Sequence, residues 1–304
     1  MRKDKPLVSI IIPNYNHADY LEERIRSILN QTYTNYEIII LDDRSTDNSI
    51  EIINKFRDNS HISNIIINEE NSGSPFKQWF KGISLAKGDL IWIAECDDSC
   101  ELCMLERLVD TYLKYNCVYA FSRSMVIDSK GTKQYISQRH FKKDIHLSGD
   151  KFIRKFLCIS NTVRNASSVI FSKNAALCIN KEFMTYHESG DWIFWIEMAR
   201  LGNVAVISSP LNLFRRYSET NTSIASKNGL TDIEDKRVFD YMIANNLISN
   251  NYIFIKKKRM AKKLLFYNAY ENEEVRLKVK KAWNIPSFYF TIPYFSFIYH
   301  KLFK

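Results

Sequence analysis

The first half of the chain alternates between short aliphatic runs and segments in which apolar side chains recur every three or four positions. An apolar run bounded by polar residues is typical of a buried strand, and the longer period is typical of a helix that packs on a sheet. This alternation predicts an α/β protein with a parallel, right-handed, Rossmann-like sheet flanked by helices. The predicted strands are 7–13, 36–42, 62–68 and 89–94, and the predicted helices are 19–30, 47–56, 75–86 and 101–115.

After residue 117 the pattern is less regular. A polar stretch predicts a loop or hairpin over 128–150, and the chain is mostly helical beyond 232. The apolar segment 191–201 predicts a helix that ends at Gly202, a residue typical of the position after a helix. We therefore expect an α/β domain over 1–230 and a helical, basic and aromatic extension over 231–304. The remaining predicted strands are 118–121, 167–171, 204–207 and 211–217.

Two of the predicted strands end in acids. Asp42 and Asp43 follow the second strand, and the sequence Glu95-Cys96-Asp97-Asp98 follows the fourth. In open α/β sheets the ligand binds at the carboxyl ends of the strands, so these acids are expected to gather in one crevice. Their mutual repulsion is relieved by a divalent cation or a hydrogen-bonding ligand. The pattern therefore indicates an enzyme that handles a phosphorylated ligand through a metal ion.

Three cysteines near the second acidic cluster have the spacing of iron–sulfur ligands. Cys96, Cys100 and Cys103 follow C-x3-C-x2-C, the pattern by which some enzymes hold a four-iron cluster. The interleaved acids would crowd negative charge around thiolates, and cysteine is commonly a small buried residue, so we favour buried thiols. A zinc site lacks a second pair of ligands. The first residues lack the apolar core of a secretion signal, so we expect reduced thiols in a cytoplasmic protein.

Eight short motifs follow one another along residues 7–225. They are VSIIIPNYN from residue 8, SILNQTY from 27, DDRSTD from 42, NSG from 71, AKGD from 86, ECDD from 95, GDWIFW from 190 and FRRY from 214. In this order they resemble the inverting glycosyltransferases of family 2, of the bacterial surface-polysaccharide type, which have the GT-A fold. The resemblance implies a GT-A catalytic domain over 1–230. It also implies transfer of a hexosyl or N-acetylhexosaminyl group from a nucleotide sugar to a hydroxyl of a glycan or lipid-linked acceptor.

The resemblance assigns the nucleotide site to the ends of the first two strands. Tyr15, just after Pro13, would stack on the base. Asp43 would accept a hydrogen bond from the imide N–H of uracil or thymine, so a UDP or dTDP donor is expected. Asp42 is expected to fix the turn, and Asp47 to cap a helix. Three further residues match the donor-binding part of the family pattern: Asn71, Gly73 and Lys77.

The second acidic cluster occupies the position of the family's D-x-D motif, with Glu95 in place of the first acid. Carboxylates two apart on an extended segment point the same way. One would ligate Mn²⁺ or Mg²⁺ while the other contacts the sugar or ribose, and the metal would neutralise the departing diphosphate. Asp97 and Asp98 are the expected metal ligands. Glu95 and Asp97 are also expected to contact the nucleotide sugar. The alternative is a charged strand-to-helix turn.

The remaining roles fall in the last two motifs. Asp191 is the expected general base, removing the acceptor's proton. The alternative for Asp191 is a helix N-cap, and the two roles are compatible. Arg215 is expected to bind the diphosphate through its guanidinium fork. Tyr217 replaces a histidine that is common in the family, whereas Arg216 is expected to be a solvated charge.

The positive charge of the chain is concentrated at its end. Residues 251–304 carry 12 Lys and Arg against 3 Asp and Glu, whereas residues 1–250 carry 31 of each. A basic helix over 256–266 precedes an uncharged segment, 285–299, that holds seven aromatic residues and two prolines. This combination fits docking on the anionic inner face of the plasma membrane, where a polyprenyl-linked acceptor would lie. The alternative is a helical cap that packs its aromatic residues on the α/β domain. No motif supports nucleic-acid binding.

Two other functions remain open from the sequence. A sugar-nucleotide pyrophosphorylase would share the nucleotide and metal, but a Gly-rich phosphate loop is expected after its first strand, and residues 13–17 contain no glycine. A non-catalytic nucleotide-sugar-binding subunit of the same fold is the second alternative. The full set of acids, with Asp191, favours the enzyme.

Overall fold

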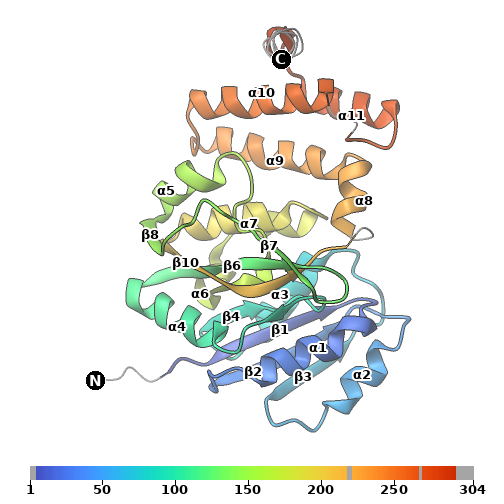
Figure 1. The fold of residues 1–304 in the computed structure, drawn as a ribbon, viewed down its shortest axis with the longest axis vertical. Helices are drawn as coiled ribbons and strands as arrows, with labels where there is room; N and C mark the ends of the chain where they lie inside the picture. Colours follow the sequence, from blue (N-terminus) through green and yellow to red (C-terminus); the bar gives the residue numbers. More distant parts are fainter. Residues whose placement is uncertain (1–4, 218–220, 267–268, 292–304) are drawn as a thin grey trace. The chain divides into compact units, whose positions relative to one another are not determined.

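The computed structural model describes residues 5–217, 221–266 and 269–291 (Figure 1). The chain divides into two compact units, the first formed by residues up to 152 together with 162–217. The second contains 153–161 and the described residues after 217. The boundary predicted after residue 230 lies inside the second unit, because α8 (Asn221–Lys227) packs against α9 (Leu230–Ala244).

The first four strands form the predicted parallel arrangement, in the order β3-β2-β1-β4. β1 and β2 are buried along their whole length, which explains their unbroken apolar sequences. Their register sets Asn14 level with Asp42, so both strands end at the same edge. The strands are β1 (Val8–Asn14), β2 (Tyr36–Asp42), β3 (Ile62–Ile67) and β4 (Leu90–Ile93).

Helices cover both faces of this sheet. Apolar residues of α1 (Ala18–Leu29), α2 (Ser49–Lys55) and α4 (Met104–Tyr115) share one core cluster with alternate residues of β1, β2 and β4. On the other face, α3 (Pro75–Leu85) approaches β1 so closely that a Cβ at Gly82 would lie 2.5 Å from the Ile11 side chain. Glycine at this position is therefore required for the close packing of helix on strand.

The second half of the sheet is mixed, which the strand pattern alone did not predict. β9 (Val169–Ser172) lies antiparallel between β4 and β6 (Cys117–Ile127), and β10 (Asn203–Arg215) runs parallel to β6. The two strands predicted at 204–207 and 211–217 are one strand, β10, because bulges around Pro210 absorb the missing backbone donor. Short strands complete the sheet: β5 (Ser99–Cys100), β7 (Lys133–Ile136) and β8 (Ile145–Ser148).

Short helices carry the chain around the second half of this unit. α7 (Gly190–Ala199) is apolar on nearly all sides, and its rings pack against β9 through the contacts of Phe171 with Phe194 and Trp195. This helix therefore belongs to the core. The remaining short elements are α5 (Gly149–Phe152), η2 (Ala166–Ser168), α6 (Lys173–Cys178) and η3 (Lys181–Thr185).

The second unit is helical. Asp232 of α9 joins its elements: the carboxylate accepts hydrogen bonds from Lys263 Nζ and Tyr270 Oη, and its backbone oxygen accepts one from Trp283 Nε1. Among the described residues, none of the helices combines the length and apolarity needed to cross a bilayer. The other helices of this unit are η1 (Ile153–Leu157), α10 (Asn250–Phe266) and α11 (Glu273–Trp283).

Candidate functional site

The turns after β1 and β2 are locked to each other. Asn14 donates hydrogen bonds to Asp42 Oδ2 and Ser45 Oγ, and Asp42 also accepts bonds from the Ser45 backbone and hydroxyl. Asn16 and Arg44 both have positive φ, at 56° and 66°. Asp42 therefore fixes the turn, as predicted, whereas the neighbouring Asp43 is bonded to a different loop.

Asp43 is the centre of a second network. Its Oδ1 accepts hydrogen bonds from Asn68 Nδ2, the Ser72 backbone and Gln78 Nε2, and its Oδ2 accepts one from the Ser72 hydroxyl. These four bonds hold the segment that follows β3, up to the start of α3, against the end of β2. Asp43 therefore organises the loop beside it, and its Oδ2, which accepts one hydrogen bond from the described residues, is the oxygen with room for a further hydrogen bond.

Asn71, Gly73 and Lys77 shape that loop. Asn71 donates from Nδ2 to the backbone oxygen of Asp43 and accepts from the Gly73 backbone through Oδ1. Gly73 has a φ of 72°, a conformation that favours glycine. Lys77 Nζ donates to the Ser72 backbone oxygen. Asn71 therefore contacts Asp43 directly, whereas Gly73 and Lys77 are linked to it through Asn71 and Ser72.

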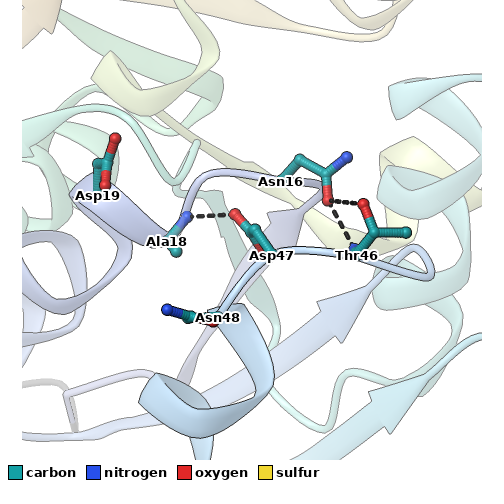
Figure 2. Close-up of a pocket in the computed structure, with 6 residues that line it drawn as sticks. All are labelled: Asn16, Ala18, Asp19, Thr46, Asp47 and Asn48. Carbon is teal, nitrogen blue, oxygen red and sulfur yellow. Dashed lines mark hydrogen bonds between the residues drawn. The ribbon is translucent and has the colours of Figure 1, made fainter.

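Tyr15 follows β1 directly and is 45% exposed. An open depression of about 490 Å³ lies at the turns that follow β1 and β2, and Tyr15 is not one of its lining residues. Figure 2 shows how polar side chains line the depression, with Asn16 Oδ1 bonded to Thr46. The lining residues are Asn16, Ala18, Asp19, Thr46, Asp47 and Asn48.

Asp47 binds the first residues of two helices at once. Its Oδ2 accepts the backbone N–H of Ala18, the first residue of α1 (Figure 2), and its Oδ1 accepts that of Ser49, the first of α2. Burial disfavours the charge, but the hydrogen bonds from Ser49 and Ala18 outweigh it and hold the pKa of Asp47 below its usual value. The N-cap positions themselves are His17 and Asn48, so Asp47 binds the first N–H group of each helix from outside the cap position.

The acidic turn after β4 brings three carboxylates together, each in different surroundings. Glu95 Oε1 accepts a hydrogen bond of 2.8 Å from Trp79 Nε1. Asp98 is 1% exposed; its Oδ2 accepts from Asn165 Nδ2 at 2.7 Å and its Oδ1 from the Arg215 backbone at 2.9 Å. Glu95 and Asp97 are both partly buried, whereas Asp98 is buried. Glu95 and Asp98 each accept a hydrogen bond from a side chain or the backbone, so Asp97 is the carboxylate of the turn that is the candidate for a ligand.

Burial and crowding make these acids hard to ionise together. Burial, with the charge of Asp97, raises the pKa of Glu95 to about 8 and that of Asp98 to about 7. Burial also raises the pKa of Asp97. A cation at the turn would lower all three, because it favours the charged form of each acid.

The donor set fits a metal that is completed by another ligand. Within the described ranges, 5–217, 221–266 and 269–291, no three acid, His or Cys side chains are grouped to hold an ion. Asp97 offers hard oxygen atoms that suit Mn²⁺ or Mg²⁺. Asp98 does not fit the predicted role of ligand as well, because its two oxygens already accept bonds that fix the turn. A metal held mainly by Asp97 would take its other oxygens from water and from a diphosphate.

Arg215 lies under the acidic turn. Its side chain is 1% exposed, and Nε donates to the Asp97 backbone oxygen while Nη2 pairs with Glu23 at 2.7 Å. Nη1 donates to the backbone oxygens of Asp128 and Ser129. The fork that was expected to hold a diphosphate is therefore directed at the protein itself, and its observed role is to anchor the turn.

Tyr217 lies near the acidic turn, close to Asp97 and Tyr20. Burial, with the negative charge of Asp97, raises the pKa of Tyr217 well above its usual value. Its ring lies 5.8 Å from that of Tyr20, and the Arg215 guanidinium lies 4.6 Å from the Tyr20 ring. The residue that replaces a histidine thus faces the acidic turn as a neutral phenol. Arg216, in contrast, is exposed.

Asp191 lies in the first turn of α7. The helix begins at Gly190, so Ser189 occupies the cap position and the purely capping alternative does not hold. Gly190 is required here, because a Cβ would lie 2.5 Å from the Phe76 ring. Phe194, further along α7, packs edge-on against Trp79, the donor to Glu95. Asp191 and the acidic turn are therefore positioned by the same group of aromatic residues.

The cysteine motif is part of the core. Cys96 and Cys100 are buried in the cluster beneath the sheet, and Gln31 Nε2 donates to Cys100 Sγ. Burial raises the pKa of both thiols, which disfavours the thiolates that an iron–sulfur cluster needs. The buried-thiol interpretation agrees with these contacts.

Three residues of the site were not found from the sequence: Arg24, Trp79 and Asn165. Arg24 is fully buried on the apolar face of α1, and its Nε donates to the Glu95 backbone oxygen at 3.0 Å. An arginine among Leu21, Ile25 and Ile28 is a visible signal, because the helical period assigns it to the core face. Asn165 gives no such signal, since it lies far from Asp98 in the sequence.

The comparisons with known proteins decide the family. Residues 9–177, more than half of the chain, match the model of glycosyl transferase family 2. The chain belongs to this family. GlyG of Streptococcus pneumoniae is 42% identical over 102 residues, which are 34% of this chain and 34% of GlyG. Chondroitin synthase of Pasteurella multocida is 38% identical over 125 residues, 40% of this chain and 12% of that synthase.

Solved structures confirm the GT-A fold of this family 2 chain. The structure of S. aureus TarS 1-349 in complex with UDP-GlcNAc matches with a TM-score of 0.59 at 17% identity, covering 91% of this chain and 71% of that one. At this identity the likeness concerns the fold alone. The chain spans about half, or less, of the length of the first curated relatives it matches.

Proposed function

We propose that this family 2 chain is a metal-dependent inverting glycosyltransferase that moves a sugar from a UDP- or dTDP-linked donor to a hydroxyl of a surface glycan or a lipid-linked acceptor. One observation carries the proposal: the acidic turn after β4 is fixed by Asp98 and Arg215, while Asp97, which is partly buried, is its candidate carboxylate for a ligand. Among the similar chains, one is named chondroitin synthase, and TarS was solved with UDP and with UDP-GlcNAc, which supports the proposal.

The donor would lie across the carboxyl ends of β1, β2 and β4. Tyr15 stacks on the base, and Asp43 accepts a hydrogen bond from its imide N–H while keeping the loop of Asn71 and Gly73 in place. Asp97 holds Mn²⁺ or Mg²⁺, which when bound neutralises charge on the diphosphate. Glu95, oriented by Trp79, faces the sugar or ribose. Arg215 serves as an anchor of the turn.

Asp191 is the general base of the proposed reaction. It takes the proton of the acceptor hydroxyl while that oxygen forms a bond to the anomeric carbon, and the bond from that carbon to the diphosphate oxygen breaks. The oxygen attacks from the side opposite the leaving diphosphate, so the configuration inverts. Asp191 lies in the first turn of α7, which is packed among aromatic side chains that hold the helix in place.

A donor panel tests this function. Melting temperature and slow donor hydrolysis are measured with each nucleotide sugar in the presence of Mn²⁺ or Mg²⁺. We expect stabilisation by uridine or thymidine donors that depends on the metal and weakens in Asp43→Ala and Asp97→Ala. The exposed change Asp58→Ala is the matched control. Stabilisation without any hydrolysis or transfer would favour the non-catalytic subunit, and no response to any donor would contradict both functions.

We further propose that α10 docks on an anionic membrane surface. Its exposed face contains Phe254, Ile255 and Leu265, each between 37 and 39% exposed, interleaved with basic residues. α10 contains no acid. Apolar side chains among cations suit the headgroup region of an anionic bilayer. The basic residues of this face are Lys258, Arg259 and Lys262.

The first residues of the predicted aromatic segment pack against α10. Tyr289 is 7% exposed and its ring lies 5.3 Å from that of Phe254, whereas Phe288 is 50% exposed. Residues 292–299 of the predicted aromatic segment lie outside the described residues. The docking surface proposed here therefore rests on α10.

A further inference from the structure

Arg24 is an arginine buried in the core without the partners that a guanidinium normally has. It is 0% exposed and shares the inner face of α1 with Leu21 and Ile25. Its Cζ lies 5.2 Å from the centre of the Trp92 ring. Nε donates to the Glu95 backbone oxygen, but Nη1 and Nη2 have no hydrogen-bond partner among the described residues.

Such a group is expensive to bury. Removing a charged side chain from water has an effective cost of several kcal/mol unless opposite charge compensates it. The compensation here comes from the acidic turn, because Arg24 Nε is bonded to the Glu95 backbone oxygen at 3.0 Å and its positive charge acts on Glu95, Asp97 and Asp98 together. The Cys100 thiol also interacts with Arg24, but burial raises the pKa of that thiol and so disfavours a compensating thiolate.

We propose that Arg24 is the built-in countercharge of the acidic turn, keeping the three carboxylates assembled without a metal and making cation binding depend on the diphosphate of the donor. The inference rests on the proposed function, since the cation is the one expected at Asp97. Arg24 is a positioning residue that acts through the turn. By its Nε bond it also fixes the backbone at Glu95, where β4 ends.

The sign of the effect follows from electrostatics. Arg24 and a divalent cation are attracted by the same carboxylates and repel each other. Removing the positive charge therefore makes the metal-free protein less stable and the vacated carboxylates more attractive to Mn²⁺. At an effective dielectric constant of about 20, charges several ångströms apart interact strongly enough to change affinity by about tenfold. A purely structural role predicts the opposite, a weaker site.

Mn²⁺ binding, measured by electron paramagnetic resonance with and without UDP, tests the inference. We expect the wild type to bind Mn²⁺ appreciably only with UDP. We expect Arg24→Met to melt at a lower temperature, yet to bind Mn²⁺ about tenfold more tightly without UDP. Arg24→Lys, which retains the charge, should keep the wild-type Mn²⁺ affinity. Arg26→Met is the control, because Arg26 lies on the same helix with its side chain 62% exposed.

Each outcome is informative. Unchanged or weaker Mn²⁺ binding in folded Arg24→Met overturns the countercharge. If neither wild type nor variant binds Mn²⁺ with UDP present, the metal-dependent function itself fails and the inference falls with it. If Arg24→Met does not fold, Arg24→Met/Asp98→Asn replaces it, because removing one negative charge should restore part of the lost stability. A double variant that folds no better than Arg24→Met, while Asp98→Asn alone folds, would reject the inference.

Discussion

The indole of Trp79 donates a hydrogen bond of 2.8 Å to the carboxylate of Glu95. The two residues come from different elements, α3 and the end of β4, and the same indole packs against Phe194 and Trp195 of α7. The acidic turn and the helix that bears Asp191 therefore share one support. This explains how a glutamate can replace the usual aspartate, because its longer side chain has a fixed partner.

Changing Trp79 to Phe removes the donor and retains most of the ring. We expect donor-dependent transfer to fall about 10- to 100-fold, since Glu95 becomes charged once a cation is bound at the turn, and a hydrogen bond to a charged group contributes about 1.5–3 kcal/mol. The measurement is the transfer rate at saturating donor, with circular dichroism to verify folding. Trp283→Phe is the control, because it loses a comparable indole bond, to Asp232, in the helical unit. Equal losses of transfer in both variants would show that Trp79 acts only through stability.

Asp191 to Asn retains the shape of the side chain and removes its basicity. We expect transfer to fall by about 10²- to 10⁴-fold, the usual contribution of a general base, while the Mn²⁺-dependent melting shift with UDP stays unchanged. Donor binding and transfer must therefore be measured on the same sample. The matched control is Asp150→Asn, which changes an acid in the first turn of α5. Substantial residual transfer in Asp191→Asn would remove it as the base.

The sequence predicted the parallel half of the fold because each strand and helix there is a separate local pattern. The mixed half depends on long-range pairing, such as β9 between β4 and β6, for which no local pattern exists. The site shows the same division. Asp43 and the acidic turn follow their strands directly, whereas the burial of Arg215 depends on backbone oxygens at Asp128 and Ser129, which only the folded loop supplies.

Glu37 provides a pH-dependent test of the fold beneath the site. Its Oε1 accepts hydrogen bonds of 2.6 Å from the Ser9 hydroxyl and the Lys87 backbone, joining β1, β2 and the turn before β4. Burial opposes its charge, but the bonds from Ser9 and Lys87 prevail and lower the pKa of Glu37. A lowered folded pKa stabilises the protein above the unfolded value of about 4.3, and this stability is lost as the pH falls through the folded pKa.

We therefore expect Glu37→Gln to lose about 1–3 kcal/mol of unfolding free energy at neutral pH. The difference from wild type should shrink as the pH is lowered below about 4, because the wild-type carboxylate is then protonated. Urea unfolding at several pH values measures this. Glu51→Gln, an exposed change on α2, should leave the pH dependence unaltered. A constant difference across the whole range would show that the charge of Glu37 does not contribute.

The docking face of α10 predicts binding that depends on charge. Each lysine near an anionic bilayer contributes about 1 kcal/mol, so Lys258→Glu/Lys262→Glu should weaken binding at least about 30-fold. Sedimentation with vesicles of phosphatidylglycerol and phosphatidylcholine measures it, and vesicles of phosphatidylcholine alone should bind little. Lys130→Glu/Lys142→Glu, at exposed positions of the α/β unit, is the control. Because the screening length shortens with salt, wild-type binding should also fall as salt rises. Equal sedimentation of both double variants would exclude α10 as the docking face.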